Sequence, residues 1–210
     1  MGKVILVISP HTDDGELGCG GSIARFVEEG HEIYYIAFST AEDSVPSYLP
    51  KNILEIEVRE ATKVLGIPPT NLMIFNYKVR KLNYVRQDIL EELVKIKREI
   101  KPDIVLIPSV NDLHQDHQTV AVEALRAFKN SASILGYELP WNHIKFSSVF
   151  FISLEDRHLE KKIEALKAYK SQSHREYMKA EFIKGLARVR GLQVGRRYAE
   201  AMEVYRWILD

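Results

Sequence analysis

Short runs of apolar residues alternate with amphipathic segments along the first 130 residues of the chain. Apolar runs rich in Val, Ile and Leu predict buried strands at residues 3–9, 31–38, 72–75 and 104–107. Apolar residues at helical spacing predict helices at residues 14–29, 52–65, 85–100 and 117–128. Strands that alternate with helices pair in parallel through right-handed crossovers. The order therefore predicts an α/β fold, with helices on both faces of a mainly parallel, twisted sheet.

The regular alternation weakens after residue 130. The remaining residues predict a strand at 149–152, helices at 157–169 and 176–188, and a final strand within 198–207. No linker, repeat or low-complexity tract divides the 210 residues, so we expect one Rossmann-like domain over residues 1–210. The connections 39–51 and 130–147 are expected to line the entrance of a pocket, although neither carries a decisive motif.

Charge and composition exclude several classes of protein. Lys+Arg and Asp+Glu are both 29, so the formal net charge is 29 − 29 = 0, whereas proteins that bind duplex nucleic acid usually carry a surplus of positive charge. The longest apolar stretches are far too short to cross a bilayer, and no secretory signal pattern begins the chain. The single cysteine, Cys19, cannot form an internal disulfide and suits a reducing compartment. We therefore expect a cytoplasmic protein that binds neither nucleic acid nor membranes.

Two polar clusters follow two of the predicted buried strands. Residues 9–16 (SPHTDDGE) follow the first strand, and residues 111–117 (NDLHQDH) follow the fourth. Ligands of open parallel sheets bind beyond the carboxyl ends of the strands, where the strand order reverses. If the first strand lies at that point beside a strand from the second half of the sheet, the two clusters face each other across one crevice.

The facing clusters offer metal-binding side chains. Together they contain three imidazoles and four carboxylates: His11, His114, His117, Asp13, Asp14, Asp112 and Asp116. A catalytic zinc ion typically binds three His, Asp or Glu side chains and keeps one position for water. That water loses a proton near neutral pH and becomes a nucleophile. The two clusters therefore favour a site for a divalent metal ion that activates water.

Each cluster taken alone has a structural explanation. Asp13 and Glu16 can form a capping box at the start of a helix, and Asp116 can cap the helix that begins beside it. The glycine-rich run 18–21 can form a phosphate-binding turn, but it lies within a helical pattern and lacks a complete G-x-G-x-x-G. Two His/Asp-rich turns that each follow a buried strand and open a helix are harder to explain as independent caps. Their joint occurrence favours the metal site.

The same residues resemble the motifs of a known family. Residues 10–21 (PHTDDGELGCGG) are similar to the first motif of the LmbE-like (PIG-L) zinc-dependent de-N-acetylases, and residues 114–117 (HQDH) are similar to the second, H-x-D-H. Weaker similarities extend over residues 61–66, 165–172 and 197–201. Within the family, the chain most resembles the branch of bacillithiol-pathway deacetylases and their archaeal and thermophile relatives.

The resemblance implies a role for each polar residue of the two motifs. It implies that three residues bind Zn²⁺: His11, Asp14 and His117. Asp13 is then the general base that takes a proton from the zinc-bound water. His114 would stabilise the oxyanion of the tetrahedral intermediate, and Asp116 would orient one of the histidines from behind.

The chain also departs from the family pattern in ways that bear on the substrate. Thr12 stands where the family usually has proline, and Gly15 separates the two aspartates from the next acid. An arginine that is common near the start of the second helix has no clear counterpart, and Arg59 is our candidate for that substrate-binding role. These departures affect the identity of the substrate and leave the metal chemistry intact.

The resemblance implies a zinc-dependent hydrolase that removes the N-acetyl group from an N-acetylglucosamine-type sugar or glycoconjugate. The residues alone support only metal-assisted hydrolysis, so two alternatives stay open. One is a nucleotide- or sugar-binding module without catalysis, and the other is a zinc amidohydrolase that acts on a different amide. Trp141 and Tyr48 are loop aromatics that can stack on a sugar or pack against the protein. The family also implies a homo-oligomer, either a trimer or a hexamer.

Overall fold

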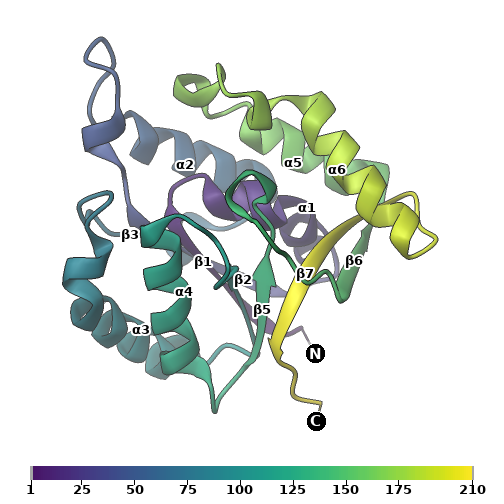
Figure 1. The fold of residues 1–210 in the computed structure, drawn as a ribbon, viewed down its shortest axis with the longest axis horizontal. Helices are drawn as coiled ribbons and strands as arrows, with labels where there is room; N and C mark the ends of the chain where they lie inside the picture. Colours follow the sequence, from purple (N-terminus) through teal and green to yellow (C-terminus); the bar gives the residue numbers. More distant parts are fainter. Residues whose placement is uncertain (1, 210) are drawn as a thin grey trace.

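The computed structural model describes residues 2–209 and contains a seven-stranded sheet with helices on both faces (Figure 1). The strands are β1 (Val4–His11), β2 (Glu32–Ser39), β3 (Leu72–Ile74), β4 (Ile104–Pro108), β5 (Ser133–Tyr137), β6 (Phe150–Leu154) and β7 (Tyr198–Arg206). The helices are α1 (Asp14–Glu28), α2 (Ile53–Leu65), α3 (Arg86–Ile100), α4 (Gln115–Phe128), α5 (Asp156–Leu166) and α6 (Ala180–Gln193). No helix within residues 2–209 has the length and apolar character needed to span a membrane.

The strand order is β3-β2-β1-β4-β5-β7-β6. The strands from β3 to β5 pair in parallel, whereas β7 runs antiparallel to both β5 and β6. The sheet is therefore mainly parallel, as the sequence predicts. The order reverses between β1 and β4, which lie side by side. The carboxyl ends of these two strands carry the two polar clusters, so the predicted juxtaposition of the clusters is confirmed.

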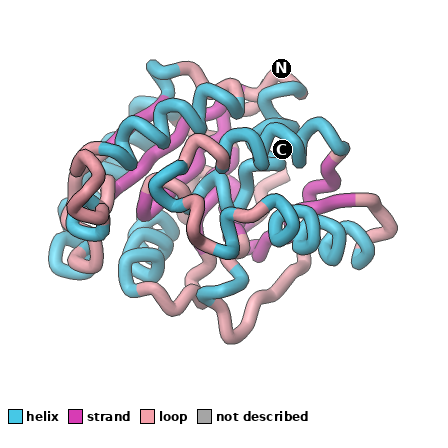
Figure 2. The backbone as a smooth tube through the Cα atoms, turned by 90° about the horizontal axis from the view of Figure 1, so that it is seen from above, coloured by secondary structure: helices cyan, strands magenta, loops and turns pink. Residues whose placement is uncertain are grey.

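The side chains of β1 alternate between the two faces of the sheet. Ile5 and Val7 belong to the core that packs under α1, α2, α5 and α6, whereas Leu6 and Ile8 belong to the core under α3 and α4. Figure 2 shows the strands between these helical layers. All four side chains are fully buried. Burial on both faces explains why the first apolar run contains no polar position.

The structure differs from the sequence-based prediction mainly after residue 130. The sequence pattern predicts no strand at Ser133–Tyr137, yet β5 is buried along its whole length. It has only five residues and includes Gly136, which the Tyr205 ring of β7 covers. The helix predicted at 176–188 begins at Ala180, after a 3-10 turn at Glu176–Met178. Short strands and 3-10 turns have weak periodicity, so their positions depend on what packs against them.

Helix α1 is bent at Cys19, whose backbone angles (φ −143°, ψ 22°) are not helical. The bend frees backbone groups on both sides, and two buried side chains bind them. Lys162 of α5 donates to a carbonyl before the bend at 2.7 Å, and Glu200 of β7 accepts from two N–H groups after it at 2.7 and 3.0 Å. Lys162 and Glu200 also form a 2.6 Å ion pair. The bent part of α1, residues 17–22, is therefore held in place by α5 and β7.

Candidate metal centre

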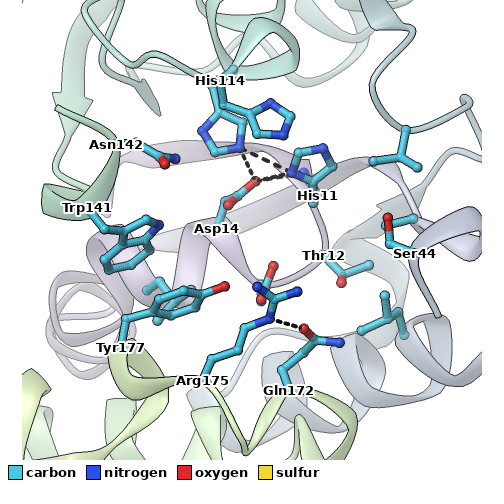
Figure 3. A pocket seen from close by; sticks show the side chains of 16 residues that line it. His11, Thr12, Asp14, Ser44, His114, Trp141, Asn142, Gln172, Arg175 and Tyr177 are labelled. Atoms are coloured by element: carbon cyan, nitrogen blue, oxygen red, sulfur yellow. Dashed lines mark hydrogen bonds and ion pairs between the residues drawn. The ribbon is translucent and has the colours of Figure 1, made fainter. Parts of the chain in front are cut away.

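A pocket of about 270 Å³ opens where β1 and β4 end beside each other (Figure 3). His11 is the last residue of β1, Asp14 begins α1, and His117 lies in the first turn of α4. Because α1 and α4 start directly after their strands, their first turns bring these side chains to the pocket. The arrangement is the one expected at the switch point of a parallel sheet.

Three side-chain atoms converge in this pocket, and we call them the metal end. Asp14 Oδ2 lies 3.1 Å from His11 Nδ1 and 3.2 Å from His117 Nε2, and the two imidazole nitrogens are 3.2 Å apart. A tetrahedral zinc ion with ligands at about 2.0–2.2 Å holds those ligands about 3.3–3.6 Å from one another. The triangle is therefore close to the size that such an ion requires. Two imidazole nitrogens and one carboxylate oxygen are also a donor set that suits Zn²⁺.

A buried carboxylate lies against the other ring nitrogen of each histidine in the metal end. His11 Nε2 lies 3.0 Å from Asp116 Oδ2, and His117 Nδ1 lies 2.7 Å from Asp112 Oδ2. Both carboxylates are fully buried. A carboxylate in this position fixes the tautomer and makes the opposite nitrogen a better ligand. The resemblance to the family implies this role for Asp116 but not for Asp112, which lies outside the H-x-D-H motif.

His114 lies beside the metal end but uses its nitrogens differently. Ligand nitrogens of His11, His114 and His117 all lie within 4.8 Å of one another, so the three rings form a second candidate ligand set. His114 is the N-cap residue of α4, however, and its Nδ1 accepts from the backbone N–H of Asp116 at 3.2 Å. A neutral ring that accepts at Nδ1 carries its proton on Nε2. His114 is therefore placed as a hydrogen-bond donor, and the set with Asp14 fits a metal ion better.

The structure corrects both helix-capping interpretations of the sequence. Asp13 occupies the N-cap position of α1, but its carboxylate makes no capping hydrogen bond. Glu16 is fully buried and accepts from the hydroxyls of Tyr35 and Tyr169 instead. The Asp116 carboxylate accepts from two backbone N–H groups of the loop before α3, and not from its own helix. The Glu16 and Asp116 carboxylates therefore stabilise contacts between segments.

The charges of the metal end shift one another's pKa values. Burial alone would lower the pKa of His11 and His117, but the Asp14 carboxylate and the carboxylates behind the rings outweigh it. The pKa of His11 rises to about 9 and that of His117 to about 10. In spite of burial, the two imidazoles hold the pKa of Asp14 well below its usual range. A divalent ion bound by the same three atoms would take the place of the protons on the rings.

Asp13 and His114 line the same pocket, but their pKa values shift in the opposite direction from those of the aspartate and the histidines of the metal end. Burial, reinforced by the charge of Asp14, raises the pKa of Asp13 to about 6. Burial and the neighbouring imidazoles lower the pKa of His114 to about 4. At neutral pH, Asp13 is therefore an ionised proton acceptor and His114 is a neutral donor. A pKa near the working pH is what general-base chemistry requires.

The other side of the pocket is formed by residues that we call the distal end: Trp141, Gln172, Arg175 and Tyr177 (Figure 3). The ring of Trp141, which follows β5, stacks on Tyr177 at a centroid distance of 4.2 Å. The guanidinium of Arg175 lies 5.7 Å from the centre of the Tyr177 ring. Three of the four residues come from the connection between α5 and α6, which the sequence analysis does not identify as part of the pocket.

Both loops that are expected to line the pocket contribute residues to it. Of the two loop aromatics, only one lines the pocket. Loop 39–51 contributes Ala41 and Ser44, and loop 130–147 contributes Trp141. Tyr48 does not line the pocket, and its side chain is largely exposed.

Arg59, the expected substrate-binding residue, does not line the pocket. Its half-exposed side chain forms a 2.7 Å ion pair with Glu55, one turn earlier in α2. The helix directs Leu54 to the pocket and Arg59 to the solvent. The arginine of this pocket is Arg175 instead. It lies three residues after the segment 165–172, whose similarity to the family is the one sequence signal that pointed toward it.

Comparisons with known proteins place the chain among deacetylases. Residues 6–128 match the model of the PIG-L family, described as GlcNAc-PI de-N-acetylase. The chain is 31% identical over 174 residues to the uncharacterized deacetylase YaiS of Escherichia coli, covering 80% of this chain and 91% of YaiS. It is 26% identical over 225 residues to the diacetylchitobiose deacetylase of Thermococcus kodakarensis, covering 95% and 82%.

A solved structure agrees with these matches. The crystal structure of a conserved protein of Thermus thermophilus superposes on this fold with a TM-score of 0.82 at 25% identity, covering 98% of this chain and 96% of that one. The family model alone spans more than half of the 210 residues. The chain therefore belongs to the PIG-L (LmbE-like) family of deacetylases.

Proposed function

We propose that this protein is a zinc-dependent hydrolase that removes the N-acetyl group from an N-acetylglucosamine-type sugar or glycoconjugate. The observation that carries the proposal is the triangle of His11 Nδ1, Asp14 Oδ2 and His117 Nε2, with sides of 3.1–3.2 Å. The diacetylchitobiose deacetylase among its relatives acts on an acetylated sugar, as its name states. Membership of the family supports deacetylation, and the triangle supports its dependence on a metal ion.

In this proposal, His11, Asp14 and His117 hold the ion, and Asp112 and Asp116 orient the two histidines. A bound divalent ion would lower the pKa of a water molecule and polarise an amide carbonyl. Three protein ligands leave a tetrahedral ion one further position, which is typical of catalytic sites.

Asp13 accepts the proton of the attacking water as the new carbon–oxygen bond forms. Its raised pKa, about 6, keeps it ionised at neutral pH and makes it an effective base. His114, neutral and protonated on Nε2, donates a hydrogen bond to the oxygen on which negative charge develops. Asp13 then returns the proton to the amine nitrogen as the carbon–nitrogen bond breaks. The products are acetate and a free amine.

The pocket suits a small substrate. A volume of about 270 Å³ accommodates one sugar ring beside the metal end. Trp141 and Tyr177 offer an aromatic wall on which the apolar face of a sugar can pack. The proposal also includes the cytoplasmic location expected from the single cysteine and the homo-oligomer expected from the family.

The test combines metal analysis with an assay of acetate release from N-acetylglucosamine conjugates. We expect about one zinc ion per chain and turnover that a chelator abolishes. Asp13→Asn should lose turnover and keep the ion, whereas Asp14→Asn should lose the ion. The reverse pattern would exchange the roles of the two aspartates.

The same experiment separates the two alternatives. A protein without zinc whose thermal stability does not respond to a chelator would be a binding module without catalysis. A zinc protein that releases acid from other amides, but no acetate from any sugar, would be an amidohydrolase of different specificity.

A further inference from the structure

Two tyrosine hydroxyls meet at the carbonyl of Thr12, directly before the proposed general base Asp13. The Tyr169 hydroxyl, which follows α5, donates to Thr12 O at 2.7 Å, and the Tyr35 hydroxyl of β2 lies 3.0 Å from the same oxygen. Both tyrosine side chains are buried. They come from elements that are distant in the sequence, so only the packed fold brings them to this carbonyl.

Glu16, in the first turn of α1, lies against both hydroxyls. One oxygen of its carboxylate lies 3.0 Å from the Tyr169 hydroxyl, and the other is hydrogen-bonded to the Tyr35 hydroxyl. Glu16 is fully buried, and its polar partners are these hydroxyls rather than a cation. Burial of a carboxylate without a cation is costly, and an apolar side chain would avoid that cost if the contact served packing alone. We call Glu16, Tyr35 and Tyr169 the tyrosine clamp.

The turn comes this close to Tyr35 because residue 15 is glycine. A Cβ atom at Gly15 would lie 2.6 Å from both Cε2 and the hydroxyl oxygen of Tyr35. The Tyr35 ring is fully buried and has little room to move away. In this chain, Gly15 separates the two aspartates from the next acid. That departure from the family pattern therefore leaves the space in which Tyr35 reaches the turn.

The Thr12 carbonyl belongs to the same peptide unit as the N–H of Asp13. A peptide unit is planar, so hydrogen bonds that fix its oxygen also fix its N–H. The Asp13 carboxylate makes no capping hydrogen bond, and it accepts a hydrogen bond from its own backbone. The carbonyl of Asp13 accepts from the N–H of Leu17 at 3.0 Å. The position of Asp13 therefore depends on backbone groups, and the tyrosine clamp holds the peptide that precedes it.

We propose that Tyr35 and Tyr169 are positioning residues for Asp13. They hold the Thr12–Asp13 peptide in the one orientation that directs the Asp13 carboxylate into the pocket, and Glu16 keeps the two hydroxyls in place. The inference rests on the proposed function, because it assumes that Asp13 takes a proton during the reaction. A general base acts only within hydrogen-bond reach, and a small misplacement can lower the rate by about 100-fold.

The kinetics of Tyr35→Phe, Tyr169→Phe and the double variant test the inference. Phenylalanine keeps the ring and removes only the hydroxyl, and the proposed zinc ligands are unchanged. We expect kcat for acetate release to fall about tenfold in each single variant and about 100-fold in the double variant. KM and the zinc content of the purified protein should stay within about twofold. A merely structural role would instead lower the fraction of folded, zinc-loaded protein.

Tyr137→Phe is the matched control. Tyr137 is also fully buried, and its hydroxyl donates to the carbonyl of Ile8 in β1 at 3.0 Å. This variant loses a comparable hydrogen bond close to the turn, but none to the Thr12–Asp13 peptide, so kcat should stay within about twofold. An equal loss of kcat in Tyr137→Phe, or a loss of zinc that parallels the loss of kcat in the clamp variants, would overturn the inference.

Amide hydrogen exchange of the metal-free protein gives a readout that does not depend on activity. The N–H of Leu17 donates to the Asp13 carbonyl and reports the opening of this turn. We expect it to exchange about tenfold faster in the double variant, and at an unchanged rate in Tyr137→Phe. Unchanged protection of Leu17 in the double variant would show that the clamp does not hold the turn, and the inference would be wrong.

The inference and the proposed function fail in different ways. Faster exchange at Leu17 that is confined to the clamp variants, in a protein that releases no acetate from any N-acetylated sugar, would refute the deacetylase activity alone. Acetate release with the same kcat in the unaltered protein and the double variant would refute the role of the tyrosine clamp alone.

Discussion

The two ends of the pocket are built on different parts of the fold. The metal end lies at the carboxyl ends of β1 and β4, where Asp14 and His117 are buried, His11 is mostly buried, and both imidazoles are bonded to fully buried carboxylates. The distal end comes from connections after β5 and α5, and Arg175 is exposed there. Groups that perform chemistry need fixed positions, which strand ends supply, whereas loops vary without disturbing the core. We therefore expect the reaction to depend on the first region and substrate choice to depend on the second.

The largest expected effect is a difference in stability loss when each of two Lys–Glu pairs is broken. The pair of Lys162 and Glu200 is buried against the bend of α1, whereas Lys179 and Glu176 form an exposed pair near the distal end. Lys162→Met leaves the Glu200 charge buried without its partner, so we expect the free energy of unfolding to fall by about 3–5 kcal/mol. Lys179→Met should have no measurable effect. Urea denaturation of both variants measures the difference, and equal effects would contradict a structural role for the buried pair at the bend of α1.

A smaller effect should follow from Asp112→Asn. The carboxylate of Asp112 lies 2.7 Å from Nδ1 of His117 and is fully buried. An asparagine amide is a weaker hydrogen-bond partner for His117, which is a proposed zinc ligand. We therefore expect zinc affinity to fall about 10- to 100-fold. Gln172→Ala at the distal end should leave zinc affinity unchanged. Competition with a chromophoric chelator measures both, and unchanged affinity in Asp112→Asn would show that His117 does not depend on this carboxylate.

The third prediction concerns pH. The pKa values of His11 and His117, about 9 and about 10, lie above the ordinary value of 6.5. The folded protein without metal then holds protons that the unfolded chain releases above pH 6.5. This contribution to stability is complete below pH 6.5 and is lost as the pH rises through 9 and 10. We expect the free energy of unfolding of the metal-free protein to fall over this window.

Zinc should remove this part of the pH dependence, because it replaces the protons on the rings. Glu16, whose pKa burial raises to about 8, adds to the decline with or without the ion. The difference between the metal-free and zinc-bound proteins therefore isolates the histidines. We also expect zinc binding at pH 7.5 to release protons into a weakly buffered solution. Binding without proton release would mean that the ion does not use these nitrogens.

The smallest effect should follow from Thr12→Val. The Thr12 hydroxyl is buried without a hydrogen-bond partner, and valine has nearly the same shape. Removing an unsatisfied buried hydroxyl should leave the free energy of unfolding unchanged or raise it by up to about 1 kcal/mol. Thermal or urea denaturation of the metal-free variant measures this. A clear loss of stability would show that the hydroxyl has a partner in solution.

Most of the first half of the fold could be predicted from the sequence. The runs that form β1 and β4 are apolar at every position because they are buried on both faces, and this pattern is visible without a structure. The His/Asp clusters after these strands then have to lie at one edge of a parallel sheet. Strand β5 could not be predicted because its five residues have no distinctive pattern. Its burial comes from neighbours that are distant in the sequence.

The candidate site also has a part that could be predicted from the sequence and a part that could not. Local pattern and spacing, together with the resemblance to a family, single out His11, Asp14 and His117, because strand–turn–helix units keep such residues together. Tertiary packing alone decides that Asp116 lies behind His11, since the two residues are 105 residues apart. It also directs Arg59 to the solvent and brings Arg175 into the pocket. A local pattern specifies the elements and their order, whereas contacts between loops depend on side chains that meet only after the elements have packed.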